Sequence, residues 1–210
     1  GVLYRGWPMA AALYIPWPSN DGGFVLHCRK GGGCFADDER VSVYESDEPV
    51  PSRLIGVPGY FGVLQGFTGE LAGKAGEVRT TGSIAYELAM TAKGVLQYAM
   101  FGAPRLWDMA GGALAVVEAG GTVMTRFRGE KRWHPLESLV PSWGEKSPTM
   151  KELRGWVAPL VAGNPKVAPL IADNVKRRFN ISSQIGKLTS PLRRKKNKPA
   201  VNPTGTSAKS

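Results

Sequence analysis

The sequence contains few of the residues that would assign it to a specialised structural class. Two cysteines among 210 residues are too few for a disulfide-stabilised mini-protein. Cys28 and Cys34 also cannot supply the four ligands of a structural zinc site, so we expect both to be buried, reduced thiols. No uncharged apolar run approaches the ~20 residues of a membrane-spanning helix. With 42% hydrophobic and 21% charged residues, the composition is that of a globular protein.

Motifs of several common enzyme classes are absent as well. His27 and His134 are the only histidines, and neither lies beside a serine or cysteine motif of a nucleophilic triad. The glycine-rich stretch 30–33 matches neither GxxxxGK[ST] nor GxGxxG. A backbone turn is therefore favoured over a phosphate-binding loop at this position.

The acidic residues stop before the C-terminal segment, which gives the chain its net charge of +10. Ten of the 27 basic residues lie from Lys176 to Lys209 with no acid among them, and the other 17 match the 17 acids. We expect a basic, disordered tail over 176–210 that binds anions weakly and without sequence specificity, or that only keeps the protein soluble.

Hydrophobic periodicity predicts a mixed α/β fold. Turn residues separate short apolar runs that favour strands, and Ser19–Gly23 has the composition of a hairpin connection. The predicted strands are 2–4, 9–15, 24–28, 54–57, 77–79, 122–127 and 157–162. The predicted helices are 63–75, 84–98, 108–119 and 164–179, and 128–156 is expected to be a loop.

The most informative segment is 107–121, with the sequence WDMAGGALAVVEAGG. It places the Asp108 carboxylate at the start of a buried helix, among small residues that permit close packing or the approach of a ligand. A plain helix cap by Asp108 is the alternative at this point.

This segment resembles the C-terminal motif of the inositol monophosphatase family of Mg²⁺-dependent, lithium-sensitive sugar phosphatases, W-D-x-A-A-G-x-x-x-x-x-E-A-G-G. Gly111 stands where the motif has its second Ala. Three further segments are similar to family patterns: Gly82–Ala85 to G-S/T-A-A, 12–35 to the hairpin G-V-I-Y-x-P…A-x-x-G-x-G-A-F, and 161–164 to V-A-A-N. The resemblance covers about residues 1–175.

The resemblance implies a layered α-β-α-β-α sandwich of the sugar phosphatase type, N-terminally truncated. It implies that Asp108 is a Mg²⁺ ligand, whereas the other ligands belong to a D-P-x-D-G-T motif and a Glu that are expected upstream of Gly1. The sequence has no such motif. No catalytic residue is therefore assigned in this chain, which we expect to be inactive alone, although its full-length parent would hydrolyse a small phosphate monoester such as inositol monophosphate.

The family places Gly82, Ser83 and Ile84 against the sugar, although helix capping by Ser83 is an equal alternative. Inositol-specific members carry a Glu shortly before the Trp-Asp pair, and 100–106 contains no carboxylate. Arg105 could bind a second anionic group of the substrate, or it could be a solvated surface residue. Histidinol phosphate, fructose bisphosphate and 3′-phosphonucleotides are alternative substrates, and a non-catalytic homologue that binds an anionic partner is the rival class.

Three parts of the chain are expected from this comparison. Residues 1–50 would be the remainder of an N-terminal antiparallel sheet domain, 51–175 a C-terminal α/β domain, and 176–210 the tail. The family further suggests a homodimer, a cytoplasmic protein, and a phosphorylated polyol or sugar as the small-molecule partner.

Overall fold

The first sheet is antiparallel and consists of five strands in the order β1-β2-β3-β4-β5. Alternating apolar and polar residues build it, and along β3 the buried residues Phe24, Leu26 and Cys28 alternate with exposed ones. The strands are β1 (Val2–Tyr4), β2 (Trp7–Ile15), β3 (Phe24–Arg29), β4 (Gly33–Ala36) and β5 (Glu39–Arg40). The three strands predicted before residue 30 are confirmed.

A second, mixed sheet lies at the centre and has the order β11-β10-β12-β9-β6-β8. Every residue of β9 and β12 is buried, as expected for strands covered on both faces. The strands are β6 (Leu54–Gly56), β8 (Glu77–Arg79), β9 (Tyr98–Phe101), β10 (Thr122–Thr125), β11 (His134–Pro135) and β12 (Leu160–Gly163). A small sheet pairs β7 (Gln65–Phe67) with β13 (Val175–Arg177).

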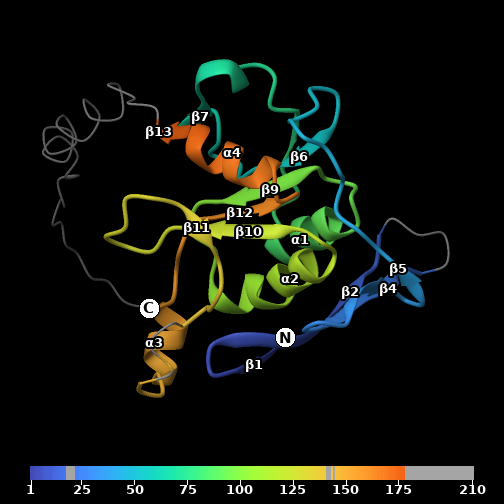
Figure 1. Ribbon diagram of the computed structural model, residues 1–210, viewed down its shortest axis with the longest axis vertical. Coiled ribbons are helices and arrows are strands. Elements are labelled where there is room, and N and C mark those ends of the chain that lie inside the picture. Colours follow the sequence, from blue (N-terminus) through green and yellow to red (C-terminus); the bar gives the residue numbers. More distant parts are fainter. Residues whose placement is uncertain (18–21, 141–142, 144, 178–210) are drawn as a thin grey trace, which may run out of the picture. The chain divides into compact units, whose positions relative to one another are not determined.

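A helix pair fills the space between the two main sheets, and another helix covers one outer face (Figure 1). Helix α2 (Leu106–Glu118) packs on β2, β3 and β4 on one side and on β10 and β12 on the other, with α1 (Ile84–Ala92) beside it. Helix α4 (Val167–Asn174) covers the far face of β10 and β12. The described residues thus stack as sheet, helix pair, sheet and helix, which confirms the predicted layered fold of the sugar phosphatase type.

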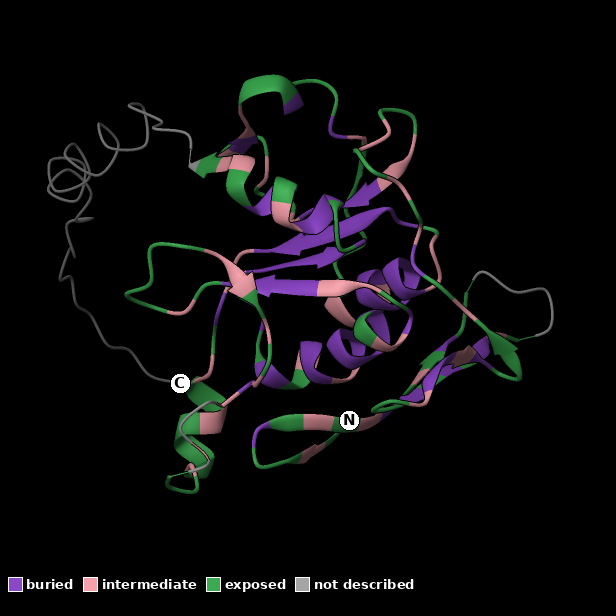
Figure 2. Ribbon diagram, viewed as in Figure 1, coloured by how far each residue is buried: buried purple, intermediate pink, exposed green. Residues whose placement is uncertain are grey.

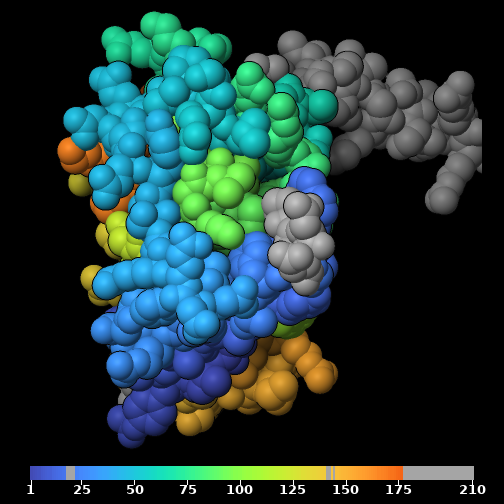
Figure 3. Space-filling view, turned by 90° about the vertical axis from the view of Figure 1, so that its right-hand side faces the viewer, coloured from blue at the N-terminus to red at the C-terminus, as the bar shows by residue number. Residues whose placement is uncertain are grey.

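Burial is concentrated in this stack (Figure 2). The buried residues of α2 include Met109, Ala113, Ala115 and Val116, which lie on more than one side of the helix because a sheet lies against each side. The first sheet, blue in Figure 3, forms the lower surface of the side shown there.

The helix predicted at 63–75 is wrong. That segment contains β7 and a short 3₁₀ helix, η1 (Gly69–Leu71). Gly69 and Gly73 have φ angles of +62° and +75°, which a right-handed helix does not accept. Turns at glycine therefore override the apolar spacing of the segment.

Two predicted helices end earlier than expected. Helix α1 stops at Ala92, where Gly94 with φ +70° turns the chain, and Tyr98 belongs to strand β9. Helix α4 starts at Val167 and ends at Asn174, since the chain then pairs with β7 as β13.

The segment expected to be a loop at 128–156 contains a short helix, α3 (Met150–Gly155). Thr149 caps it: its side chain accepts from the Glu152 N–H, and the Glu152 side chain accepts from the Thr149 N–H. This capping box is visible in the sequence and could have revealed the helix.

The computed structural model describes residues 1–17, 22–140, 143 and 145–177. Within them, residues 1–177 form one compact unit, and the proposed division at residue 50 stays a prediction. Part of the predicted connection at 19–23 and the tail from residue 178 lie outside the described residues. None of the helices among the described residues is long and apolar enough to cross a membrane.

Candidate active site

Asp108 is the third residue of α2 and is half-buried. The N-cap is Arg105 rather than Asp108, and the Asp108 main-chain N–H donates to the Arg105 carbonyl at 3.1 Å. Leu106 and Met109 are buried on either side, whereas Trp107 is exposed. The carboxylate therefore lies in the first turn, where the free N–H groups and the helix dipole favour negative charge.

The 82–84 segment forms the start of α1, which packs beside α2. Gly82 has φ +79°, and the Ser83 hydroxyl accepts a hydrogen bond from the Tyr86 N–H at 3.3 Å. Ser83 is thus the N-cap of α1, the alternative that the sequence left open. Its hydroxyl can still face a ligand, because a capping oxygen uses only part of its hydrogen-bonding capacity.

Glu87, which the sequence analysis did not single out, holds this segment from inside the helix. Glu87 is buried, with 3% of its surface exposed. Its Oε1 accepts hydrogen bonds from both the N–H and the hydroxyl of Thr81, at 2.9 and 2.8 Å. Thr81 in turn precedes Gly82. A carboxylate in the first turn of a predicted helix was the signal that could have identified it.

Arg105 lies between α2 and α3. It is exposed, it bridges to Val157 through the main chain, and its Nη1 donates to the Arg154 carbonyl at 3.5 Å. This long hydrogen bond leaves most of the guanidinium donors available to an anion.

The helices of Ser83 and Asp108 are in close contact through Gly112. A Cβ at Gly112 would lie only 2.6 Å from the Leu88 Cβ of α1. The glycine thus allows α1 and α2 to approach closely, as the motif suggested. No hydrogen bond joins the 82–84 segment to Asp108 or Arg105 within the described parts of the chain.

Glu118, at the other end of the motif, has a structural role. Its two carboxylate oxygens accept the N–H groups of Gly31 and Gly33 at 2.8 and 2.9 Å. The glycine-rich loop after β3 is therefore a backbone turn whose N–H groups bind an anion of the protein itself. This agrees with the preference for a turn over a phosphate-binding loop.

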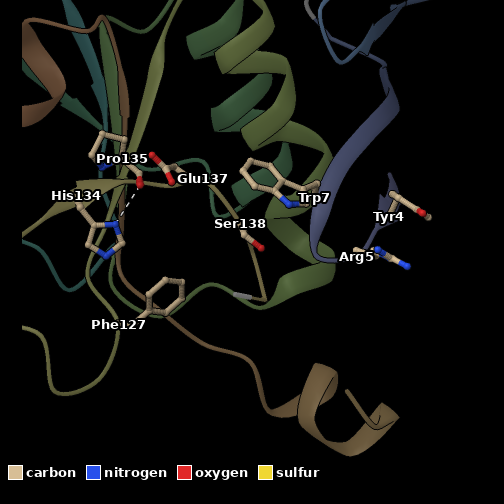
Figure 4. Close-up of a pocket in the computed structure, with 8 residues that line it drawn as sticks. All are labelled: Tyr4, Arg5, Trp7, Phe127, His134, Pro135, Glu137 and Ser138. Carbon is tan, nitrogen blue, oxygen red and sulfur yellow. Dashed lines mark hydrogen bonds between the residues drawn. The ribbon is translucent and has the colours of Figure 1, made fainter. Parts of the chain in front are cut away.

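One hollow borders the start of α1, and a larger one lies elsewhere on the folded unit. The first, of about 590 Å³, is lined by Ser83 and Thr81 together with Tyr14, Trp17 and Tyr86, and the Trp17 and Tyr86 rings stack at 6.4 Å. The other, of about 690 Å³, contains none of the residues that the sequence singled out for the site (Figure 4). Its lining residues are Tyr4, Arg5, Trp7, Phe127, His134, Pro135, Glu137 and Ser138.

The residues present do not fit a magnesium site of their own. Mg²⁺ requires near-octahedral oxygen coordination and usually more than one protein carboxylate or phosphate ligand. Asp108 supplies one carboxylate, and no group of three or more His, Cys, Asp or Glu side chains that could hold a metal occurs in the described ranges.

A family model described as the inositol monophosphatase family matches residues 1–162. The chain belongs to this family. Among curated proteins, the chloroplastic phosphatase IMPL1 of Arabidopsis thaliana is 30% identical over 163 residues, which are 72% of this chain and 43% of IMPL1. The predicted resemblance is confirmed.

Solved structures support the fold. The inositol monophosphatase from Anabaena sp. PCC 7120 superposes with a TM-score of 0.54 at 17% identity, over 82% of this chain and 62% of that one. Staphylococcal SaIMPase-II bound to inositol monophosphate gives the same score and identity over 90% of this chain and 62% of that one. The chain thus spans less than half of IMPL1 and about three fifths of these structures.

Proposed function

We propose that this chain supplies one side of the active site of a magnesium-dependent phosphatase that hydrolyses a small phosphate monoester such as inositol monophosphate. The family match over residues 1–162, together with a carboxylate in the first turn of α2, is the observation that supports it. Phosphate monoesters hydrolyse extremely slowly without a catalyst, and divalent cations are a common means of accelerating the reaction.

In this proposal Asp108 is one of several metal ligands, and the others come from outside these 210 residues. The Gly82–Ile84 segment at the start of α1 binds the polyol, held in place by the Thr81–Glu87 hydrogen bonds. Where the substrate carries a second anionic group, as a bisphosphate does, Arg105 binds it. A homodimer and a cytoplasmic location stay predictions.

A second candidate substrate is a nucleotide monophosphate. The stacked rings of Trp17 and Tyr86 line the hollow that contains Ser83. Aromatic faces of this kind stack on nucleobases. One solved relative, SaIMPase-II, is described with 2′AMP bound, at a TM-score of 0.52.

Two measurements of phosphate release test the proposal. The 210-residue chain with Mg²⁺ and inositol monophosphate is expected to release no phosphate, because the residues that the structure describes hold no metal-ligating group around Asp108. Turnover by this chain would refute that argument. The native protein that carries this sequence, isolated from its source, is expected to release phosphate only with Mg²⁺, and lack of release from inositol monophosphate and from 2′AMP would refute the phosphatase.

Asp108→Asn and Asp173→Asn form a matched pair in the native protein. Asp173 is exposed on α4, so its loss should leave turnover unchanged. Removing a residue that only hydrogen-bonds to a metal ligand typically lowers metal affinity or activity about 10- to 100-fold. Removing a ligand itself should lower activity more, so we expect at least about 100-fold lower turnover for Asp108→Asn. Equal turnover of the two variants would exclude Asp108 from the metal site.

A further inference from the structure

The two cysteines face each other across neighbouring strands. Cys28 of β3 and Cys34 of β4 are partners in the antiparallel register. Both are free thiols, with 6% and 0% of their surface exposed. Directly opposite residues have side chains on the same face of the sheet, so both thiols lie in the core layer beneath α2.

The hydrogen bonds around them show which kind of pair this is. The Asp37 N–H donates to the Val25 carbonyl at 2.8 Å, so the hydrogen-bonded positions of β3 and β4 include 25 and 37. Since such positions alternate along an antiparallel ladder, 28 and 34 form a non-hydrogen-bonded pair. The carbonyl of Cys34 correspondingly accepts from Val41, on the opposite side of β4.

A non-hydrogen-bonded pair suits a disulfide. Its Cα atoms are typically ~4.5 Å apart, and its side chains approach more closely than those of the alternate pairs. A disulfide needs Cα atoms about 4.4–6.8 Å apart. The backbone of β3 and β4 can therefore accept the bond without rearrangement.

Both cysteines also depart from the family hairpin pattern together. Aligned on A-x-x-G-x-G-A-F, residues 28–35 place Cys28 and Cys34 at its two alanine positions. The pattern has alanine, which carries no thiol, at both positions. The two opposed cysteines thus bring a thiol pair that the family pattern lacks.

We propose that Cys28 and Cys34 form a reversible dithiol–disulfide site that a hydroperoxide oxidises. This inference concerns the hairpin alone and does not depend on the phosphatase proposal. A hydroperoxide is the appropriate oxidant because the low exposure of both thiols excludes a bulky mixed disulfide.

The reaction proceeds in two steps. The Cys28 thiolate attacks hydrogen peroxide, which takes up two electrons: Cys28 becomes a sulfenic acid and hydroxide leaves. The Cys34 thiol then attacks the sulfenic sulfur, the S–S bond forms and water leaves. Interaction with the Cys34 thiol lowers the pKa of Cys28, whereas the same interaction and burial raise the pKa of Cys34, which favours Cys28 as the first nucleophile.

Peptide mapping tests the pairing directly. The folded chain is treated with hydrogen peroxide, alkylated in denaturant without reduction, and digested with trypsin. Trypsin cuts after Arg29 and Lys30, so only a disulfide can hold peptides 6–29 and 31–40 together. We expect this cross-linked pair, at the mass of both peptides less two hydrogens, in monomeric protein, and its disappearance with dithiothreitol.

Two variants separate the steps. Cys34→Ser keeps a donor to Cys28 but cannot form the bond, so dimedone should trap a sulfenic acid at Cys28. Cys34→Ala removes the donor, which should raise the pKa of Cys28 and lower its thiolate fraction, so Cys28 should react more slowly with peroxide than in Cys34→Ser. The same peroxide treatment is applied to the chain unfolded in urea as a reference. If peroxide oxidises the thiols in urea but leaves them reduced and alkylatable when it is applied to the folded chain, the proposal is overturned. Cross-links that form only between chains would also overturn it.

Discussion

Glu87 shows how a single buried carboxylate can hold a segment of the candidate site. Its Oε1 accepts two hydrogen bonds from Thr81, immediately before the Gly82–Ile84 segment. Nothing in the residue types alone pairs Glu87 with Thr81, since the pairing depends on where α1 begins. The local sequence predicted the helix, but only the structure reveals this contact.

Glu87→Ala is expected to destabilise the fold by about 3 kcal/mol, because Thr81 loses two part-buried hydrogen bonds to a charged group, each worth about 1.5 kcal/mol at the lower end of its range. Urea denaturation gives the change in the free energy of unfolding. Glu77→Ala is the control, since Glu77 is 53% exposed and should change stability little. Equal losses in the two variants would contradict the role of Glu87.

His134 and Glu130 should show a pH-dependent interaction on the surface. Their side chains lie 2.8 Å apart and are 40% and 41% exposed. The Pro135 carbonyl, then Glu130, raises the pKa of His134, while the His134 hydrogen bond lowers the pKa of Glu130. The raised pKa of His134 stabilises the fold fully below the pKa of the unfolded residue, about 6.5, and this contribution is lost as the pH rises. The lowered pKa of Glu130 stabilises the fold fully above the pKa of the unfolded residue, about 4.5, and this contribution is lost as the pH falls. The pair therefore stabilises the fold most between about pH 4.5 and 6.5.

The measurement is a proton NMR titration of His134. Glu130→Gln should lower the pKa of His134 only in part, because the Pro135 carbonyl still accepts a hydrogen bond from the ring at 3.0 Å. Glu137→Gln, which removes a weaker and more remote charge, should lower it less. A larger shift with Glu137→Gln would show that the hydrogen bond to Glu130 does not form in solution.

At the scale of elements, strong patterns predicted structure and glycines disrupted it. The alternation in β3 and the apolar run of α2 gave nearly correct bounds. Strand β3 buries every second residue on one face, and α2 is buried on more than one side, so each burial pattern is regular along the sequence. The failures at 63–75 and after Ala92 follow glycines with positive φ, which apolar spacing does not reveal. Most motif positions in α2 proved to serve packing rather than chemistry.

Two neighbouring glycines of α2 give a sharp test of this packing. A Cβ at Gly112 would lie 2.6 Å from the Leu88 Cβ, whereas at Gly111 it would lie 3.3 Å from the Ala11 Cβ. Gly112→Ala is therefore expected to cost about 1–3 kcal/mol through overpacking. Gly111→Ala, which restores the family residue, should cost clearly less, because the preference of alanine for helix, about 1 kcal/mol, offsets a contact that is only slightly tight.

Thermal and urea unfolding of both variants gives the comparison. Since the two residues are adjacent in one helix interior, differences in helix propensity cancel between them. A loss for Gly111→Ala as large as that for Gly112→Ala would mean that α2 does not pack on α1 as described. Far-ultraviolet circular dichroism should show the same helix content in both.

At the scale of the whole molecule, most of the net positive charge lies outside the folded unit. Residues 178–210 hold eight basic residues and no acid, so removing them lowers the net charge from +10 to +2. The layered unit lies within residues 1–177. Ending the chain after Arg177 should therefore leave the unfolding midpoint unchanged and abolish most binding to polyanions.

Binding to single-stranded oligothymidylate at several salt concentrations measures this effect. Each neutralised phosphate contributes about −0.7 to the slope of log K against log salt, so eight contacts would give at most about −6 for the whole chain. The shortened chain should bind with a slope near zero. Equal slopes would place the anion-binding charges on the folded unit, where Arg5, Arg29 and Arg40 are exposed, and would refute the proposed role of the tail.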